Sequence, residues 1–260
     1  MFFRSAFLST LMAAFASAEI EVDVLGQSGK IMIYDAALGK SDPDRVTMTM
    51  DYLYELDEND NVVGKAGSPL QKHSTETFAN QQFSYSDIQE VVFSNLTADY
   101  LSFDADVYKA GTIKVETYIF KENGTITTST NETLEVVEGD FKFAIQLIDW
   151  NWCNPCADGN ATHIDVGVEL KGKDDQPTED DLGGGISVIM SELINIDGEN
   201  VAMPDGYPKV VTKNGKTLFV FRFPKEVEGG AALYDYDPLI TTGGPRAQED
   251  RCGLFCRVCG

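Results

Sequence analysis

The stretch that decides the fold is Val46–Leu56, which reads VTMTMDYLYEL. Apolar or aromatic residues stand at every second position: Val46, Met48, Met50, Tyr52, Tyr54 and Leu56. Polar residues stand between them, namely Thr47, Thr49, Asp51 and Glu55. Because successive side chains of a strand point to opposite faces, this period of two predicts a strand with one face on a core and the other in water.

The same alternation recurs along most of the chain. The clearest repeats are residues 112–120, 141–147, 164–170 and 217–223, and shorter ones fill much of the remainder. Clusters of Asn, Asp and Gly separate them, and these residues favour turns. Only residues 186–193 fit a short helix as well as a buried strand. The pattern predicts an all-β protein with little helix: an antiparallel β-sandwich, or a barrel-like relative, of a dozen or more strands.

The first eighteen residues have the features of a secretory signal peptide. Arg4 precedes an apolar stretch over residues 6–15, and Ala16-Ser17-Ala18 supplies the small residues of a cleavage site. The apolar stretch is about half the roughly 20 residues that a membrane span requires, and no other segment is apolar enough to cross a bilayer. We therefore expect residues 1–18 to be removed and the protein to be secreted into the extracellular space.

The remainder divides into one domain and a tail. Residues 19–240 are expected to form a single β-sandwich, with an acidic, Gly-rich loop at residues 171–185 inside it. Residues 186–240 are too few for a stable core of their own, so we expect them to supply strands to the same sandwich, with a small second domain as the alternative. Residues 241–260 lose the alternation and form a Cys-containing C-terminal tail.

The chain is strongly acidic. It holds 42 Asp and Glu against 20 Lys and Arg, a formal net charge of −22. Such a charge repels nucleic acid and favours divalent cations, mineral or basic partners. It also keeps an exported protein soluble without any specific partner.

Four N-x-[ST] sequons predict a glycoprotein, provided that the host has a eukaryotic secretory pathway. Their asparagines are Asn95, Asn123, Asn131 and Asn160. Asn123 and Asn160 stand beside Gly in expected hairpin tips, whereas the flanks of Asn95 resemble strand.

Five cysteines predict disulfides in an oxidising compartment, with a pairing that the sequence leaves open: Cys153, Cys156, Cys252, Cys256 and Cys259. A Cys153–Cys156 bridge is favoured, as a staple in an expected hairpin between the strands on either side. Because five is odd, a leftover thiol either links two chains into a dimer or stays unpaired. A zinc site formed by Cys153, Cys156, Cys256 and Cys259 is the alternative.

The segment Trp152-Cys153-Asn154-Pro155-Cys156 resembles the W-C-x-P-C motif of thioredoxins. That chemistry needs the first cysteine at a helix N-terminus, where the helix dipole lowers the thiol pKa. Here the next residues are Ala157-Asp158-Gly159, which start a helix poorly. A redox site is therefore not expected.

No catalytic or cofactor signature is found in the sequence. The only histidines, His73 and His163, stand in no known motif, and neither a nucleophile elbow nor a phosphate-binding Gly-rich loop is present. We therefore lean against an enzyme and expect no cofactor apart from calcium. A secreted hydrolase with a pair of carboxylates remains an alternative.

Calcium is the one ion for which the sequence offers candidate ligands. Asp57, Asn59 and Asn61 place oxygen atoms at alternating positions, as in the first half of an EF-hand loop. Val62 stands where that loop needs Gly, and Ser68 stands where it needs Glu. Weak binding by an acidic turn is the expectation here. A second acidic patch comprises Asp174, Asp175, Glu179, Asp180 and Asp181. For both sets, solvated hairpin tips without a bound ion are the favoured alternative.

The function that these features favour is a structural or interaction module of the extracellular matrix or a cell surface. Its expected partners are extracellular proteins, glycans, mineral or cations, and not nucleic acid. A carbohydrate-binding, lectin-like module is the alternative from another class, with Trp150, Trp152, Tyr234 and Tyr236 as candidate sugar platforms.

Overall fold

The computed structural model describes residues 20–42, 45–65, 73–78, 81–108, 110–156, 158–172, 187–225 and 231–241. Over these residues the chain is an antiparallel β-sandwich, which confirms the expected fold class. Helical structure in the described ranges is limited to the short 3-10 turn η1, Gly39–Ser41, and to Phe78, which is also in 3-10 conformation. No helix there is both long and apolar enough to cross a membrane.

The first sheet, called sheet A, has seven strands. In spatial order they are β1 (Ile20–Val24), β2 (Lys30–Asp35), β3 (Val46–Leu56), β12 (His163–Lys171), β17 (Lys216–Pro224) and β16 (Lys209–Lys213), with β4 (Val62–Val63) paired to the end of β3. Every pairing in sheet A is antiparallel.

The second sheet, called sheet B, has ten strands. Its main path is β15 (Glu199–Ala202), β14 (Leu193–Ile196), β18 (Leu233–Tyr236), β11 (Phe141–Ile148), β8 (Gly111–Phe120), β7 (Leu96–Val107) and β5 (Ser84–Tyr85). Beside this path lie β6 (Gln89–Phe93), β13 (Ser187–Ile189) and β19 (Leu239–Thr241). A separate hairpin is formed by β9 (Gly124–Thr127) and β10 (Thr133–Val136).

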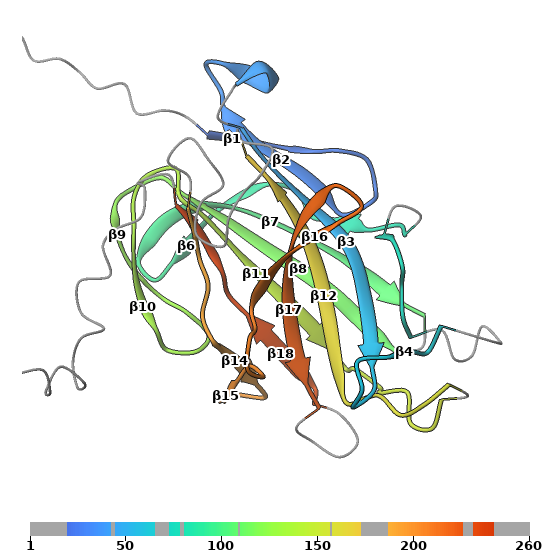
Figure 1. Ribbon diagram of the computed structural model, residues 1–260. Helices are drawn as coiled ribbons and strands as arrows, with labels where there is room; N and C mark the ends of the chain where they lie inside the picture. Colours follow the sequence, from blue (N-terminus) through green and yellow to red (C-terminus); the bar gives the residue numbers. More distant parts are fainter. Residues whose placement is uncertain are drawn as a thin grey trace, which may run out of the picture.

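The two sheets enclose the main core (Figure 1). Met48 and Phe221 from sheet A and Phe103 and Phe143 from sheet B are fully buried there, and the Phe143 and Phe221 rings meet at 6.4 Å. Each such side chain contributes about 1.5–3 kcal/mol by leaving water. A smaller core holds the β9–β10 hairpin to sheet B through Ala98, Phe120, Ile126, Val136 and Leu239.

A β-bulge in β3 overturns part of the expected facing pattern. Gly167 pairs with Tyr52 but Val168 pairs with Met50, so Asp51 is an extra residue on β3. An extra residue moves every later side chain to the opposite face. Glu55, expected in water, is fully buried, and Tyr54 shares the outer face of sheet A with Asp165. Leu53, an apolar residue at a position where the alternation requires a polar one, is the sign of this insertion in the sequence, and it is fully buried.

The segment between β11 and β12 also differs from its expected form. A hairpin was expected there, yet β11 belongs to sheet B and β12 to sheet A, so residues 149–162 cross from one sheet to the other. Alternation tells which face of a strand is buried but not which strand it pairs with.

The strands that follow residues 173–186 are divided between the two sheets. Sheet A contains β16 and β17, and sheet B contains β13–β15, β18 and β19. Residues 186–193, left open between helix and strand, contain strand β13. The expected signal peptide, residues 173–185 of the acidic loop and residues 242–260 of the tail lie outside the described residues.

Candidate functional site

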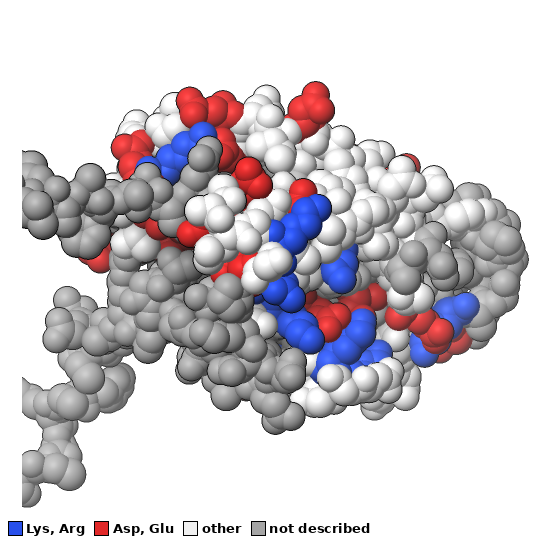
Figure 2. All heavy atoms as spheres, turned by 90° about the horizontal axis from the view of Figure 1, so that it is seen from above, with Lys and Arg blue, Asp and Glu red and all other residues white. Residues whose placement is uncertain are grey.

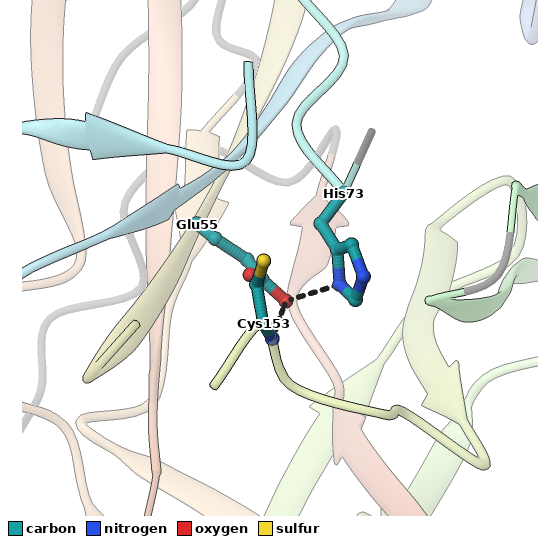
Figure 3. A group of neighbouring side chains, drawn as sticks. All are labelled: Glu55, His73 and Cys153. Atoms are coloured by element: carbon teal, nitrogen blue, oxygen red, sulfur yellow. Dashed lines mark hydrogen bonds and ion pairs between the residues drawn. The ribbon is translucent and has the colours of Figure 1, made fainter. Parts of the chain in front are cut away.

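A buried carboxylate, that of Glu55, holds the crossing segment to β3 (Figure 3). It accepts hydrogen bonds from Trp150 Nε1–H at 2.8 Å and from the Cys153 amide at 3.1 Å, and His73 Nδ1 lies 3.2 Å away. The backbone amide of Glu55 donates to Ser74 Oγ at 2.9 Å. The bulge that turns Glu55 inward thus places its carboxyl group where β3, the segment around His73 and the crossing segment meet.

The Glu55, His73 and Cys153 side chains have the donor types of a metal site, and their ligand atoms lie within 4.8 Å of one another. However, Cys153 is joined to Cys156 in a disulfide with a Cα–Cα distance of 5.3 Å. A metal would need the free Cys153 thiolate. The cluster therefore acts as a hydrogen-bonded staple of the core.

The Cys153–Cys156 bridge also bears on the other cysteine alternatives. The motif lies in a turn with a cis Asn154–Pro155 peptide, and no helix follows it among the described residues. The bridge uses two of the four cysteines, Cys153 and Cys156, that the alternative zinc site requires as free thiolates. Cys252, Cys256 and Cys259 lie outside the described residues, so their pairing and the disulfide-linked dimer stay predictions.

The candidate calcium ligands Asp57, Asn59 and Asn61 lie in the turn between β3 and β4. Asp57 Oδ1 accepts the amides of Asn59 and Asn61 at 2.8 and 2.9 Å, and Oδ2 accepts Asn61 Nδ2–H at 3.1 Å. These bonds, chiefly those from Asn61, lower the pKa of Asp57. Calcium binding here would have to replace them, and it stays a prediction. The second acidic patch, at residues 174–181, lies outside the described residues.

An ion-pair network that the sequence did not reveal joins β12, β17 and the β3–β4 turn. Arg222 donates to both oxygens of Asp165, at 2.6 and 2.8 Å, and to Asp60 at 2.8 Å. His163 Nε2 lies 3.0 Å from Asp60. Burial, assisted by the charge of Arg222, lowers the pKa of His163, so its ring is neutral at pH 7. The sequence offered one sign of this network: Asp165 and Arg222 each stand within an apolar strand, and such residues are rarely buried unless they are paired.

Cations gather on the outer face of sheet A, although the whole molecule is acidic. This cationic face comprises Lys209, Lys213, Lys216 and Arg222. Lys209 Nζ lies 4.1 Å from the ring centre of Tyr207, and Lys213 Nζ lies 4.4 Å from that of Tyr52. Figure 2 shows a group of Lys and Arg side chains near the middle of the face in view, with acidic side chains among them, and further Lys and Arg side chains toward its two ends.

The lysines of the cationic face are not equally neutralised. Lys216 forms ion pairs with Asp51 and Glu169, at 2.8 and 3.2 Å. Lys209 and Lys213 contact tyrosines but pair with no carboxylate of the described residues.

The outer face of sheet B, in contrast, carries carboxylates. Asp104 and Asp106 stand two residues apart on β7, and Glu116 stands on the neighbouring β8. Lys114 pairs with Glu116 at 2.6 Å, and Thr112 donates to Asp106 at 2.8 Å. Side chains two residues apart on a strand are about 6.8 Å apart. The sheet thus holds Asp104 and Asp106 at this spacing, with Glu116 opposite Ser102 on the neighbouring strand.

All four sequon asparagines are exposed. Asn95 forms the two-residue turn between β6 and β7 with Ser94, and Asn131 lies in the β9–β10 turn. Asn123 lies between β8 and β9, which do not pair, and Asn160 lies in the crossing segment, so neither is at the hairpin tip expected for it. A glycan on any of them would not meet the core, and their occupancy stays a prediction.

The aromatic platforms of the lectin alternative are not at the surface. Trp150 and Trp152 are 1% and 5% exposed, and Tyr234 and Tyr236 are fully buried. Trp152 Nε1–H donates to Tyr234 Oη within the core. A sugar-binding site on these four rings was therefore a wrong expectation; they instead fill the interior near the crossing segment.

A hollow of about 680 Å³ lies between β13, β14 and the turn before β16, with Glu132, Glu192 and Asp205 in its lining. Three carboxylates in one hollow make it the place to look for the hydrolase alternative, which stays a prediction. A second hollow, of about 720 Å³, is lined in part by Lys65, Glu76 and Asp106.

One comparison with known proteins bears on this arrangement. A family model described as acidic skeletal organic matrix protein matches residues 10–182. The match covers 173 of the 260 residues, as counted from 10 to 182 inclusive. It includes every strand from β1 to β12, and hence the buried Glu55 and the sheet B carboxylates.

Proposed function

The chain belongs to the acidic skeletal organic matrix protein family, and from this premise we propose that it is an exported, glycan-bearing matrix protein that binds calcium or a calcium mineral through carboxylates displayed on a rigid β-sandwich. Membership of the family already makes it an acidic, mineral-associated matrix protein. The proposal adds the export, the glycans, the cation and the surface that binds it.

The observation that carries the proposal is the carboxylate set Asp104, Asp106 and Glu116 on sheet B. These residues lie on two mutually paired strands, so their backbone positions are fixed by the ladder. A rigid array loses less conformational entropy on binding a surface than carboxylates on a disordered chain would.

Binding by such an array is expected to be weak for each ion and collective for a surface. Calcium prefers six to eight oxygen ligands, and sites with few protein ligands bind in the roughly 10⁻⁴–10⁻³ M range of extracellular modules. A mineral surface presents many cations at once, so several weak contacts add up to firm adsorption.

The exposed sequons support the proposed export and glycans. Asn95, Asn123, Asn131 and Asn160 all lie outside the cores, and Cys153 and Cys156 form a disulfide suited to an oxidising compartment. Both the export and the glycans can be tested by expressing the protein in eukaryotic cells. The mass of the protein recovered from the medium is measured before and after enzymatic removal of glycans.

The test of the cation-binding surface compares two variants of equal charge. Asp104→Asn with Asp106→Asn removes two carboxylates of the array, and Glu58→Gln with Glu199→Gln removes two exposed carboxylates elsewhere. Retention on calcium carbonate or calcium phosphate particles is measured at about 0.15 M salt, together with calcium titration calorimetry.

We expect the array variant to lose at least threefold in retention and the control variant to lose little. Equal losses would show that total charge, not the array, governs adsorption. Absence of both retention and millimolar calcium binding in the unaltered protein would refute the cation-binding part of the proposal.

A further inference from the structure

The two edges of sheet A are complementary to each other. Its main path has six strands, all antiparallel, with β1 at one edge and β16 at the other. Because six is even, the two edge strands run in opposite directions. A second copy placed beside the first in the same orientation therefore brings its β1 antiparallel to β16, with the outer faces on the same side.

On β16, Val210 and Thr212 direct their backbone groups outward. Asn214 and Gly215, with φ of 54° and 78°, form a two-residue turn that joins β16 to β17. The residues that flank such a turn exchange hydrogen bonds with each other, and the bonded pairs then alternate along the ladder. Lys209, Val211 and Lys213 thus bond to β17, which leaves the N–H and C=O groups of the other two residues at the edge.

On β1, the outward groups belong to Val22 and Val24. The Leu25 amide donates to the Lys30 carbonyl at 2.9 Å, in the same register as the strand pairs. By the same alternation, Glu21 and Asp23 bond to β2. Among the described residues, no hydrogen-bond partner meets the outward groups of either edge strand. Within the described part of the chain, both edges are therefore open to strand addition.

Matching the outward groups fixes the pairing. When Val210 lies opposite Val24 and Thr212 opposite Val22, Lys213 stands opposite Glu21 across the new ladder, and its ammonium leaves Tyr52 and Tyr54 to reach that carboxylate. Val211 then faces Asp23, with Lys209 diagonal to that carboxylate. A shift by two residues keeps the hydrogen bonds and places Lys209 opposite Asp23. Both registers join a cation to an anion on the outer face, while a shift by one would lose the hydrogen bonds and reverse the faces.

Other pairings of the same edges are disfavoured by charge. Two β16 strands would bring Lys209 and Lys213 against the same lysines, and two β1 strands would bring Glu21 and Asp23 against the same acids. Asp23 already pairs with Lys40 at 2.6 Å, but Lys40 is a surface side chain, and Glu21 is exposed. Only the pairing of unlike edges unites opposite charges.

We propose that β16 of one molecule pairs with β1 of the next, so that sheet A continues from copy to copy in an open-ended assembly. The same contact repeats without closing, which generates a filament whose helical turn follows the twist of the sheet. This assembly goes beyond the proposed cation binding and does not depend on it.

The proposal is tested by sedimentation velocity over a range of protein concentrations, in EDTA to remove divalent cations. At a salt concentration of about 0.15 M, the repulsion between charges is screened over a distance of roughly 8 Å. We expect the unaltered protein to form a concentration-dependent series of species. Lys213→Glu and Glu21→Lys should each weaken association by about tenfold, because an attraction becomes a repulsion. The two substitutions combined should restore it.

A backbone variant tests the strand pairing independently of charge. Thr212→Pro removes one outward N–H, while the ladder to β17 keeps its bonds, so the fold survives and association is lost. Lys121→Glu, on the loop after β8, makes the same charge change as Lys213→Glu away from either edge and should not weaken association. Circular dichroism verifies folding of each variant.

Two results would overturn the proposal. One is a protein that stays monomeric at every concentration, and the other is an assembly that neither Thr212→Pro nor the charge reversals alter. Because the buffer contains no divalent cation, either result leaves the calcium and mineral test unaffected.

Discussion

At the scale of single residues, Glu55 shows how much depends on one buried charge. Its carboxylate accepts from Trp150 and Cys153, which belong to the segment that crosses between the sheets. Removal of the carboxylate would leave these buried donors without an acceptor, a loss that costs more than an ordinary hydrogen bond contributes.

We therefore expect Glu55→Ala to lower the free energy of unfolding by about 3–5 kcal/mol, measured by urea denaturation. Glu55→Gln keeps the shape and one acceptor and should cost less. Glu58→Ala, exposed in the following turn, serves as the control and should change stability by about 0.5 kcal/mol at most. An unchanged midpoint for Glu55→Ala would show that the staple is dispensable.

Asp235 on β18 is a second charged residue in an unfavourable place. Its Oδ1 is buried and has no hydrogen-bond partner among the described residues. Burial, reinforced by the neighbouring Asp237, raises the pKa of Asp235 from 3.8 to about 7. Lys142 forms its ion pair with Asp237, at 2.7 Å, and only partly offsets this effect.

Because the folded-state pKa of Asp235 is raised, the protonated carboxyl contributes its full stability below about pH 4, and this contribution is lost as the pH rises through about 7. Asp235→Asn mimics the protonated form. We expect this variant to exceed the unaltered protein in unfolding free energy by roughly 1–3 kcal/mol at about pH 8, with no difference near pH 4. A constant difference across that range would contradict the assigned pKa.

At the scale of elements, the bulge in β3 decides which residues face the core. It carries Glu55 inward and brings the Tyr52 ring over Gly167 of β12. A Cβ at Gly167 would lie 2.3 Å from Tyr52 Cε1, closer than atoms can approach. The glycine thus makes room for the aromatic ring that also supports Lys213.

Gly167→Ala is expected to destabilise the fold by about 1–3 kcal/mol, because the Tyr52 ring must move. In a Tyr52→Ala background the same substitution should cost little, so the two changes are strongly non-additive in thermal or urea unfolding. Additive effects would indicate that the ring and the glycine do not meet.

Elements also show where sequence patterns stop being informative. The strands at residues 112–120 and 164–170 were placed correctly, because alternation directly reflects burial on one face. The expected hairpin at residues 149–162 was wrong, since turn residues indicate that the chain turns but not where the next strand pairs. The expected sugar-binding surface on Trp150 and Trp152 was wrong, because alternation does not show whether a strand continues or the chain leaves the sheet.

At the scale of the whole molecule, the charges are unevenly distributed despite the net value of −22. Sheet B carries the spaced carboxylates of β7 and β8, and sheet A carries lysines at one edge and acids at the other. A matrix protein that binds cations on one face and associates through the edges of the other sheet can do both at once. The two proposals therefore use separate surfaces and fail independently.

The sequence by itself determined the all-β class and the acidic character, because the period of two and the composition are local properties that need no knowledge of neighbours. Family membership agrees with the acidic character. Only the tertiary structure decided that Glu55 is buried, that Arg222 meets Asp60 and Asp165, and that β1 and β16 are the free edges of sheet A. Each of these depends on pairing between strands far apart in the chain, and a single inserted residue such as Asp51 is enough to reverse the faces that a local pattern assigns.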